Sequence, residues 1–556
     1  MPENTRSGTV SEQREELAGF SPVAAQGIDP LQLAAQLEAE PGTEEESDQP
    51  LLERTVRAVG WQFATVFGKY VLQFLVIAVL SRLLTPDDFG LVAQAMIFIG
   101  LANMFADIGV APALIQRKSV TDRHIRVAFT FSILTGMVMA GIAWLTAWIP
   151  AMAFESEGLE PLLQFLAITL LFKSGGLTAS CLLMRRLNFR SWFWTYISAS
   201  VVGSACVGIS LALAGYGAWA LAWAYVAQDG LSCLLLLIVV RHPMRPLLSR
   251  TETRQLLGYG VGITLSKVMH YGTQTLDQFV IGRWLGEAAL GLYSQAFRLV
   301  TISNETFAQV LGRVLFPAFS KMQDDTERLR NAYLRAVSSV ALLGFPIFAG
   351  LAVVAPEAVL FVFGSQWGGT VIPLQVLCIG GLFWSVTTLS DQIAHATAAV
   401  YHMFRRRIVL AVAIFVGALL GSKYGINGVA VGVASSQVMM YVIMARLSLR
   451  LIGGNWRQFA ACQMPGAIVT ALIAIGAHTV ATLLRANESP TFVTLLLTVT
   501  AGFVIGIVAV LGLPRTKLPD NVRWSLEKLD EMIAKAALIL QGRGLPVPFM
   551  AGRLNK

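Results

Sequence analysis

The stretch RLLTPDDFGLVAQA, residues 82 to 95, returns in altered form as RWLGEAALGLYSQA, residues 283 to 296. A constant offset of 201 residues relates the two copies. Extended without a gap over residues 70–103, the comparison yields 11 identities in 34 positions. Some matches are polar, such as Gln73 with Gln274 and Asn103 with Asn304, and a shared apolar composition does not readily produce them. The chain therefore carries an internal repeat.

The composition indicates that this repeat lies in a membrane protein. Hydrophobic residues make up 55% of the chain and charged residues only 14%, whereas an average soluble domain is about 25% charged. Apolar runs of about 20 residues recur from Trp61 to Gly512, each long enough to cross a hydrocarbon core roughly 30 Å thick. They predict an all-α membrane protein with 14 transmembrane helices at 58–81, 89–114, 126–149, 161–184, 192–214, 218–240, 256–281, 289–316, 332–354, 371–396, 407–423, 425–447, 459–483 and 490–513.

Loop charges predict the orientation of these spans. The loops after even-numbered spans hold 21 Lys and Arg residues, against 4 in the loops after odd-numbered spans. By the positive-inside rule, both termini of this multi-pass protein should be cytoplasmic. The net charge of +8 is then explained by the basic cytoplasmic loops that orient the protein in the membrane. These loops also attract anionic headgroups, so membrane lipids are expected partners and nucleic acid is not.

A second echo shows how far the repeat extends. Tyr216-Gly217 matches Tyr424-Gly425 at an offset of 208, so spans one to six correspond to spans seven to twelve. Because six is an even number, the two halves should enter the membrane in the same direction, as parallel repeats. Duplicated bundles of this kind enclose a cavity and alternate its access. A local alternative is that residues 82–90 are simply a connection between helices, with Pro86 and Gly90 as turn and helix-start residues.

This repeat predicts five segments. They are a disordered acidic cytoplasmic tail (1–50), an N-terminal six-helix bundle (51–245), a C-terminal six-helix bundle (246–452), transmembrane helices 13 and 14 (453–513), and a cytoplasmic tail with an amphipathic helix (514–556). The amphipathic helix is predicted from apolar residues at helical spacing between Val522 and Leu540.

Four stretches resemble a known family: LSRLLTPDDFGLVAQA (80–95), FADIGVAPALIQRK (105–118), LDQFVIGRWLGEAALGLYSQAFRL (276–299) and VLFPAFSKMQDD (314–325). They are similar to Wzx-type polysaccharide flippases of the colanic-acid and exopolysaccharide group, in the multidrug/oligosaccharidyl-lipid/polysaccharide exporter superfamily. The resemblance covers roughly residues 55–515. It implies a bacterial inner-membrane protein that transfers an undecaprenyl-diphosphate-linked oligosaccharide repeat unit from the cytoplasmic to the periplasmic leaflet. A polysaccharide polymerase and glycosyltransferases are the protein partners that such a role suggests.

Polar residues inside the spans are the candidate substrate contacts. Lys267, His270, Gln274 and Asp277 form a stripe on span seven, Arg298 and Glu305 share a face of span eight with Gln295 and Gln309, and Lys69 and Gln73 lie one turn apart on span one. Ionisable groups are costly against lipid, so they should face a hydrated cavity. Lys69, Lys267 and Arg298 are the preferred phosphate contacts. The alternative is structural, with Asp277 neutralising Lys267 or Arg298 and Glu305 pairing across helices.

Other intramembrane groups are candidates for ion coupling. Asp107, Asp229, Asp391 and His395 could each bind a proton, and Asp391 and His395 lie one helical turn apart. The alternative is that they are hydrogen-bonded structural residues. The five cysteines are scattered within spans, so neither a metal site nor a disulfide is expected, and the sequence suggests no cofactor.

Other functions are open at this stage. A drug exporter or a peptidoglycan-precursor flippase of the same superfamily is the nearer alternative. A membrane-embedded glycan polymerase or ligase should carry a catalytic acid or base on a sizeable outside loop, whereas the predicted outside loops are short. No Gly-Lys phosphate loop of an ATP-driven pump is present. The chain is therefore expected to be a transporter and not an enzyme.

Overall fold

A computed structural model describes residues 51–107, 114–115, 120–186, 188–397, 400–512 and 523. This part of the chain contains helices and connections, without a strand among the described residues. The predicted N-terminal tail and nearly all of the predicted C-terminal tail with its amphipathic helix lie outside the described residues.

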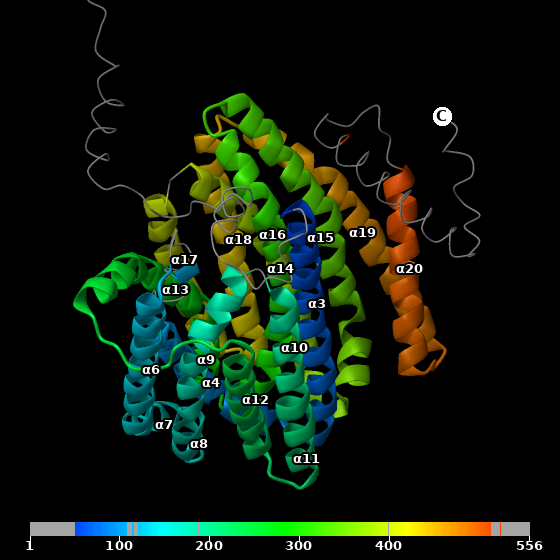
Figure 1. The fold of residues 1–556 in the computed structure, drawn as a ribbon. Helices are drawn as coiled ribbons and strands as arrows, with labels where there is room; N and C mark the ends of the chain where they lie inside the picture. Colours follow the sequence, from blue (N-terminus) through cyan, green and yellow to red (C-terminus); the bar gives the residue numbers. More distant parts are fainter. Residues whose placement is uncertain are drawn as a thin grey trace, which may run out of the picture.

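The first half of the chain builds one group of helices. They are α3 (Leu51–Leu83), α4 (Pro86–Ala106), α6 (Asp122–Leu145), α7 (Trp148–Phe154), α8 (Leu159–Leu166), α9 (Ile168–Arg185), α10 (Phe189–Ser200), the π-helix η2 (Val201–Val207), α11 (Gly208–Leu213) and α12 (Ala218–Val239). Figure 1 shows α6, α9, α10 and α12 side by side, with their axes roughly parallel.

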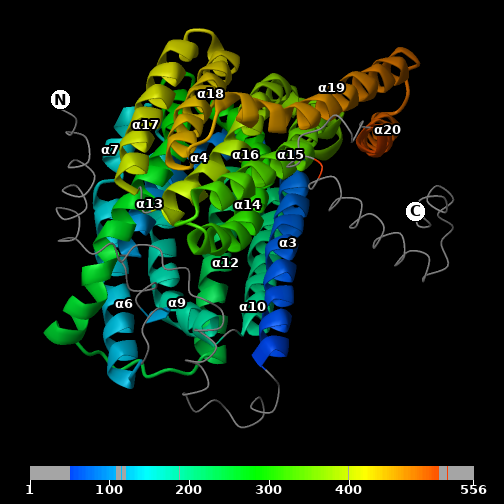
Figure 2. The same cartoon turned by 90° about the horizontal axis from the view of Figure 1, so that it is seen from above.

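The second half builds a second group. Its helices are α13 (Arg250–Trp284), α14 (Glu287–Lys321), α15 (Thr326–Val362), the 3₁₀-helix η3 (Ser365–Thr370), α16 (Val371–Ala396), α17 (Val400–Ser422) and α18 (Gly425–Leu451). In Figure 2, α16, α17 and α18 lie on one side of the molecule and α6, α9, α10 and α12 on the other. Helix α14 packs against α4 of the first group and α16 of its own group, and so joins the two.

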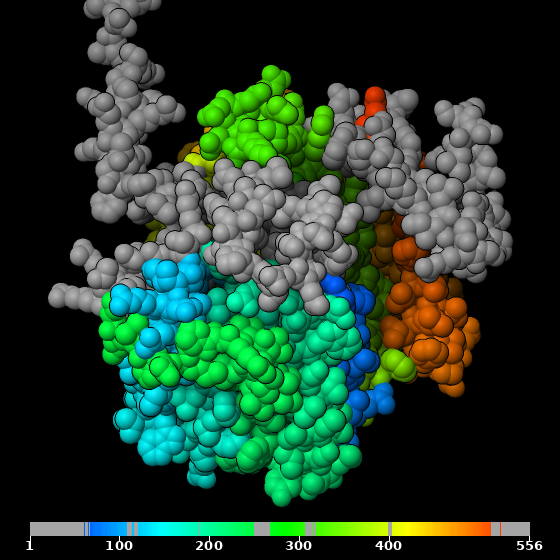
Figure 3. All heavy atoms as spheres, viewed as in Figure 1, coloured from blue at the N-terminus to red at the C-terminus, as the bar shows by residue number. Residues whose placement is uncertain are grey.

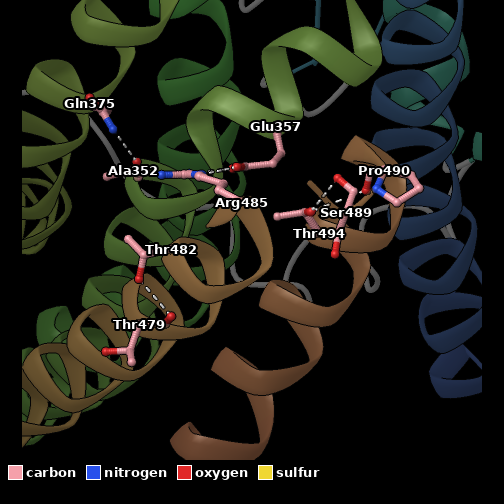
Figure 4. Close-up of polar contacts among 9 residues, drawn as sticks. All are labelled: Ala352, Glu357, Gln375, Thr479, Thr482, Arg485, Ser489, Pro490 and Thr494. Atoms are coloured by element: carbon pink, nitrogen blue, oxygen red, sulfur yellow. Dashed lines mark hydrogen bonds and ion pairs between the residues drawn. The ribbon is translucent and has the colours of Figure 1, made fainter. Parts of the chain in front are cut away.

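Two further helices stand at the margin. Helix α19 (Trp456–Ala486) packs along α15, and α20 (Thr491–Gly512) packs on α19. In Figure 3, α20 (orange) is at the edge of the molecule, with α3 (blue) between it and the front helices. Arg485 of α19 holds Glu357 of α15 through two hydrogen bonds of 2.6 and 2.9 Å, drawn in Figure 4. Most of the α20 surface is exposed and apolar, as expected of a helix that faces lipid.

The TPDD sequence explains where α4 begins. Thr85 is the N-cap, Pro86 occupies the first helical position, and Thr85 and Asp88 form a reciprocal capping box. The Asp88 N–H donates to the Thr85 hydroxyl (3.3 Å), and the Thr85 N–H donates to the Asp88 carboxylate (2.9 Å). At the equivalent place in the second copy, Gly286 precedes α14 with a φ of 87°, which glycine adopts without strain. Both copies of the repeat therefore encode a turn followed by a helix start.

These two helix starts also contact each other. A Cβ atom added to Gly90 would lie 1.9 Å from the carbonyl oxygen of Glu287, and one added to Gly291 would lie 1.9 Å from the carbonyl oxygen of Pro86. Pro86 and Glu287, like Gly90 and Gly291, are related by the repeat offset of 201. The contact is therefore reciprocal, as it is across a two-fold axis. The local interpretation of residues 82–90 as a simple connection is incomplete, because the same residues form this contact.

Further polar contacts join the two groups at what we call the short-loop end, which holds the connections 84–85, 214–217, 285–286 and 363–364. Arg82 donates to the carbonyls of Phe361 and Val362 at the end of α15. The indole of Trp367 donates to the Ser81 carbonyl at 2.7 Å. In the equivalent place, Arg283 pairs with Glu155 at 2.7 Å. Arg82 and Arg283 are matching positions of the repeat, and each arginine reaches across to the other group.

Ten helices or helix runs in the described residues are long and apolar enough to cross a membrane. The other long helices are α3, α13, α14 and α17. Each of the four overlaps a predicted span and is at least 23 residues long. Helices α13, α14 and α17 carry charged and polar residues, including Asp277, Arg298 and Arg407. The number of membrane spans shown is therefore about ten, and the full fourteen stay a prediction.

Candidate functional site

A central cavity of about 520 Å³ lies between the two groups of helices. Its walls come from α3, α4, α10, η2 and α12 of the first group and from α13 and α14 of the second. Toward the short-loop end the lining is apolar, with Leu80, Phe89 and Leu221, and the charged residues lie deeper along the helices. The polar and charged lining residues are Lys69, Tyr70, Gln73, Tyr196, Ser200, Ser204, Tyr225, Gln228, Tyr271, Thr275, Gln278, Ser294, Arg298, Thr301 and Glu305.

Two cations, Lys69 and Arg298, line this cavity. Within the described part of the chain, no carboxylate lies in ion-pair distance of Lys69 or Arg298. The Lys69 ammonium instead lies 5.7 Å from the ring centre of Tyr70 and 5.8 Å from that of Tyr196. Aromatic faces attract a cation without neutralising it. The cavity therefore presents two positive charges that a ligand anion could reach.

Glu305 is the acidic residue among the cavity-lining side chains. Its carboxylate accepts a hydrogen bond of 2.8 Å from the Tyr70 hydroxyl, which links α3 to α14. The repeat partner of Tyr70 is Tyr271, whose hydroxyl donates instead to the carbonyls of Met96 and Ile97, both at 3.0 Å. Helix α13 is thus bound directly to the backbone of α4, whereas Tyr70 links α3 to α14 through a side-chain hydrogen bond.

The predicted stripe on span seven does not form the cavity wall. Helix α13 lines the cavity with Tyr271, Thr275 and Gln278, and none of the four predicted stripe residues is among the lining residues. Asp277 is 1% exposed and accepts a 2.6 Å hydrogen bond from the buried hydroxyl of Tyr293. Its predicted place on the cavity wall is wrong. The residues that do line the cavity, Tyr271, Thr275 and Gln278, each follow a predicted residue by one position. Because each residue turns a helix by about 100°, they form a different face of α13 from the predicted one.

The other members of that stripe have separate surroundings. His270 Nδ1 lies 3.1 Å from Arg407 of α17. Lys267 lies within electrostatic range of Asp107, the residue that caps the end of α4. Gln274 contributes its backbone carbonyl to the side-chain amide of Gln278 at 3.1 Å. Lys69, Gln73, Arg298 and Glu305 are the predicted substrate contacts that the structure brings together around one cavity.

The ion-coupling candidates are dispersed over both groups. Asp229 pairs with Lys173 at 3.5 Å, between α12 and α9. Asp391 pairs with Arg407 at 3.3 Å, between α16 and α17, one turn from His395. Among the described residues, no three His, Cys, Asp or Glu side chains gather as metal ligands would. Asp229 and Asp391 are thus placed in ion pairs, and the part of all four candidates in energy coupling stays a prediction.

Sequence reasoning missed the wall formed by α10, η2 and α12. It comprises Tyr196, Ser200, Ser204, Tyr225 and Gln228. All five side chains are uncharged, and they lie in spans that read as ordinary apolar helices. Their spacing in the sequence was nevertheless informative. Tyr196, Ser200 and Ser204 are four residues apart, and Tyr225 and Gln228 are three apart, so each set lies on one helix face.

One known protein family matches more than half of the chain. The model of a family described as "Polysaccharide biosynthesis protein" matches residues 79–372, more than half of the sequence. These residues run from the end of α3 to the start of α16 and so include both copies of the repeat and the α4–α14 contact.

Two curated proteins are similar over much of their length. The lipopolysaccharide biosynthesis protein WzxC of Escherichia coli K12 is 27% identical over 418 residues, which is 74% of this chain and 84% of that protein. The succinoglycan biosynthesis transport protein ExoT of Rhizobium meliloti 1021 is 30% identical over 316 residues, which is 56% of this chain and 63% of that protein.

Solved structures show the same fold at low sequence identity. The lipid II flippase MurJ, in an inward closed conformation, superposes with a TM-score of 0.64 at 13% identity, covering 82% of this chain and 98% of that one. An inward-facing multidrug resistance transporter of the MATE family gives a TM-score of 0.58 at 16% identity, covering 69% and 94%.

Proposed function

This chain belongs to the polysaccharide biosynthesis protein family, and we propose that it is a flippase for an undecaprenyl-diphosphate-linked oligosaccharide repeat unit. The observation that carries this proposal is the central cavity between the two helix groups, with Lys69 and Arg298 unpaired by acids among the described residues. A diphosphate carries the opposite charge and offers several oxygens for charge-assisted hydrogen bonds. The relatives are named as a lipopolysaccharide biosynthesis protein and a succinoglycan biosynthesis transport protein.

We further infer that the two groups are parallel repeats that alternate access to this cavity. The reciprocal Gly90–Gly291 contact and the matching arginines 82 and 283 support two equivalent halves. Counting α3, α13, α14 and α17 as four further spans gives fourteen, because each overlaps a predicted span and α13, α14 and α17 carry charged residues that lower their hydropathy.

The charges at the two ends support an orientation for this arrangement. Arg186, Arg241, Arg330 and Arg450 lie at the end opposite the short loops, which the positive-inside rule makes cytoplasmic. The short-loop end is then periplasmic, and the polar contacts of Arg82, Arg283 and Trp367 hold it shut. We infer from this closure an inward-facing state, in which a lipid-linked sugar would enter from the cytoplasmic leaflet.

Replacing both cavity cations tests the proposal. A Lys69→Ala, Arg298→Ala double variant should abolish transfer of lipid-linked repeat units and leave membrane insertion intact, because the diphosphate loses its charged partners. The measurement is the accumulation of lipid-linked glycan in spheroplasts after depletion of the native protein. Lys423→Ala, which removes an exposed positive charge at the connection between α17 and α18, is the matched control.

The same assay separates the alternatives. A drug exporter would leave the lipid-linked intermediates unchanged on depletion, and a peptidoglycan-precursor flippase would change lipid II instead. Normal glycan export in the double variant would show that neither Lys69 nor Arg298 is needed to bind the substrate. Polymerase and glycosyltransferase partners stay predictions that co-purification would test.

A further inference from the structure

The cavity wall of α10, η2 and α12 differs chemically from the rest of the site. We call it the hydroxyl wall and define it as Tyr196, Ser200, Ser204, Tyr225 and Gln228. It carries hydroxyls, one carboxamide and two aromatic rings, but no charge. The two cavity cations instead come from α3 and α14.

The π-helix η2 accounts for the geometry of this wall. In an α-helix, residues spaced four apart drift around the axis with each step, because a turn holds 3.6 residues. A π-helix has wider turns, with i→i+5 hydrogen bonds. The α-helical step from Tyr196 to Ser200 rotates the side-chain direction slightly past one full turn about the helix axis. The step from Ser200 to Ser204 runs through η2, which starts directly after Ser200, and its wider turn rotates the direction back. All three side chains thereby line the same cavity.

The wall is held in place by close packing between η2 and α12. A Cβ atom on Gly203 would lie 2.4 Å from the backbone nitrogen of Gln228, so the two backbones are in direct contact there. The Ser204 hydroxyl donates to the Gln228 side-chain oxygen, which fixes the orientation of the carboxamide. The Tyr196 hydroxyl lies beside Ser200 and Gln228. The amide N–H groups of Gln228 belong to a preorganised set of polar groups at the cavity surface.

This chemistry suits a sugar ring better than a phosphate. A sugar presents hydroxyls that both donate and accept, as hydroxyl and carboxamide side chains do, and its C–H faces can pack on an aromatic ring. A phosphate would need positive charge, which the wall lacks. Lys69, however, lies 5.8 Å from the ring centre of Tyr196, so a cation borders the wall at a distance comparable to the width of one sugar ring.

We propose that the hydroxyl wall is the subsite for the sugar attached directly to the diphosphate, while Lys69 and Arg298 hold the diphosphate itself. This inference rests on the proposed function and deepens it, because it assigns selectivity for the first sugar to Tyr196, Tyr225 and Gln228. The later sugars of the repeat unit extend away from this subsite.

Binding of two lipids to the purified full-length protein tests the subsite. The probes are undecaprenyl diphosphate and undecaprenyl diphosphate bearing a single hexose, each titrated in nanodiscs and measured by native mass spectrometry. The wild type should bind the hexosyl lipid about tenfold more tightly, as one or two net hydrogen bonds would give. Gln228→Ala and Tyr225→Leu should bring this ratio close to one and leave the affinity for undecaprenyl diphosphate unchanged.

Matched controls separate the sugar subsite from the cations and from folding. Arg298→Ala should weaken both lipids by the same factor and so keep the ratio. Gln375→Ala removes a carboxamide that bonds to Ala352 away from the cavity, and should change neither affinity. If Gln228→Ala does not yield folded protein, Ser204→Ala frees the carboxamide without removing it and should still reduce the ratio.

The outcomes are distinguishable. A wild type that binds both lipids equally, or wall variants that keep the tenfold ratio, would overturn the subsite while the proposed function stands. A wild type that binds neither lipid would overturn the proposed function itself.

Discussion

At the scale of single residues, the buried pair of Asp277 and Tyr293 shows how an intramembrane acid serves structure. The carboxylate accepts from the Tyr293 hydroxyl and from the N–H of Gln278 at 2.9 Å. A partnered acid of this kind was the alternative to ligand binding that the sequence left open, although the partner is a tyrosine and not the expected Lys267 or Arg298.

Removing the acid should therefore destabilise the protein. Asp277→Ala leaves the Tyr293 hydroxyl buried without its acceptor, which costs about 1–3 kcal/mol, and should lower the melting temperature in detergent. Asp277→Asn keeps an acceptor and should lose less. An Asp277→Ala variant that melts with the wild type would contradict the structural role.

The candidate site was only partly predictable at this scale. Lys69 and Arg298 stand out in sequence because a charge in an apolar span demands an explanation. Tyr196, Tyr225 and Gln228 stand out less, because they carry no charge. Asp277 was misplaced because helical spacing identifies residues that share a face but does not say what that face meets.

At the scale of elements, the crossing of α4 and α14 depends on two glycines. Gly90→Ala or Gly291→Ala would place a methyl group against a backbone carbonyl that cannot move independently of its helix. Overpacking of this kind costs about 1–3 kcal/mol, so each variant should melt at a lower temperature than the wild type.

A third glycine provides the matched control for this prediction. Gly272→Ala on α13 meets no atom within 4 Å and should be neutral or stabilising by up to about 1 kcal/mol, because alanine favours the helix. Equal melting temperatures for Gly90→Ala and Gly272→Ala would show that the close contact is not required.

The attachment of α19 to α15 is a second property of elements. Glu357 has a side chain only 6% exposed, whereas that of Arg485 is 38% exposed. Arg485→Ala would leave a buried carboxylate unpaired. The loss should be below the roughly 3–5 kcal/mol of a fully buried pair, because solvent screens the exposed partner.

Thermal unfolding and limited proteolysis would measure this attachment. Arg485→Ala should lower the melting temperature and speed cleavage near residue 487, and adding Glu357→Gln should recover part of the loss. Arg457→Ala, an exposed arginine on the same helix, should change neither. If it behaves like Arg485→Ala, the effect belongs to surface charge in general.

At the scale of the whole molecule, the closed short-loop end should open during transport. Ser156 and Glu287 are in hydrogen-bond contact across the two groups. In a variant without the five native cysteines, a Ser156→Cys, Glu287→Cys pair joined by a short thiol cross-linker should stop transfer of lipid-linked glycan, and cleavage of the linker should restore it.

A second cross-link controls for the chemistry itself. Glu357→Cys with Arg485→Cys joins α15 to α19, neither of which contributes to the cavity wall. This link should leave transfer unchanged. Full activity in the cross-linked Ser156–Glu287 protein would exclude opening at this end.

The sequence by itself determined the helical membrane class and the approximate places of the long helices, because local composition and periodicity encode both. Its constant offset predicts a repeat, and the predicted single spans 161–184 and 192–214 are divided into α8 and α9 and into α10, η2 and α11. The residues 371–396, predicted as a span, are the bounds of α16. Only the tertiary structure decided which face of each helix meets the cavity, that Gly90 and Gly291 touch, and that Asp277 is sealed against Tyr293. Those outcomes depend on how each helix is rotated against its neighbours, and packing between residues far apart in the chain sets that rotation.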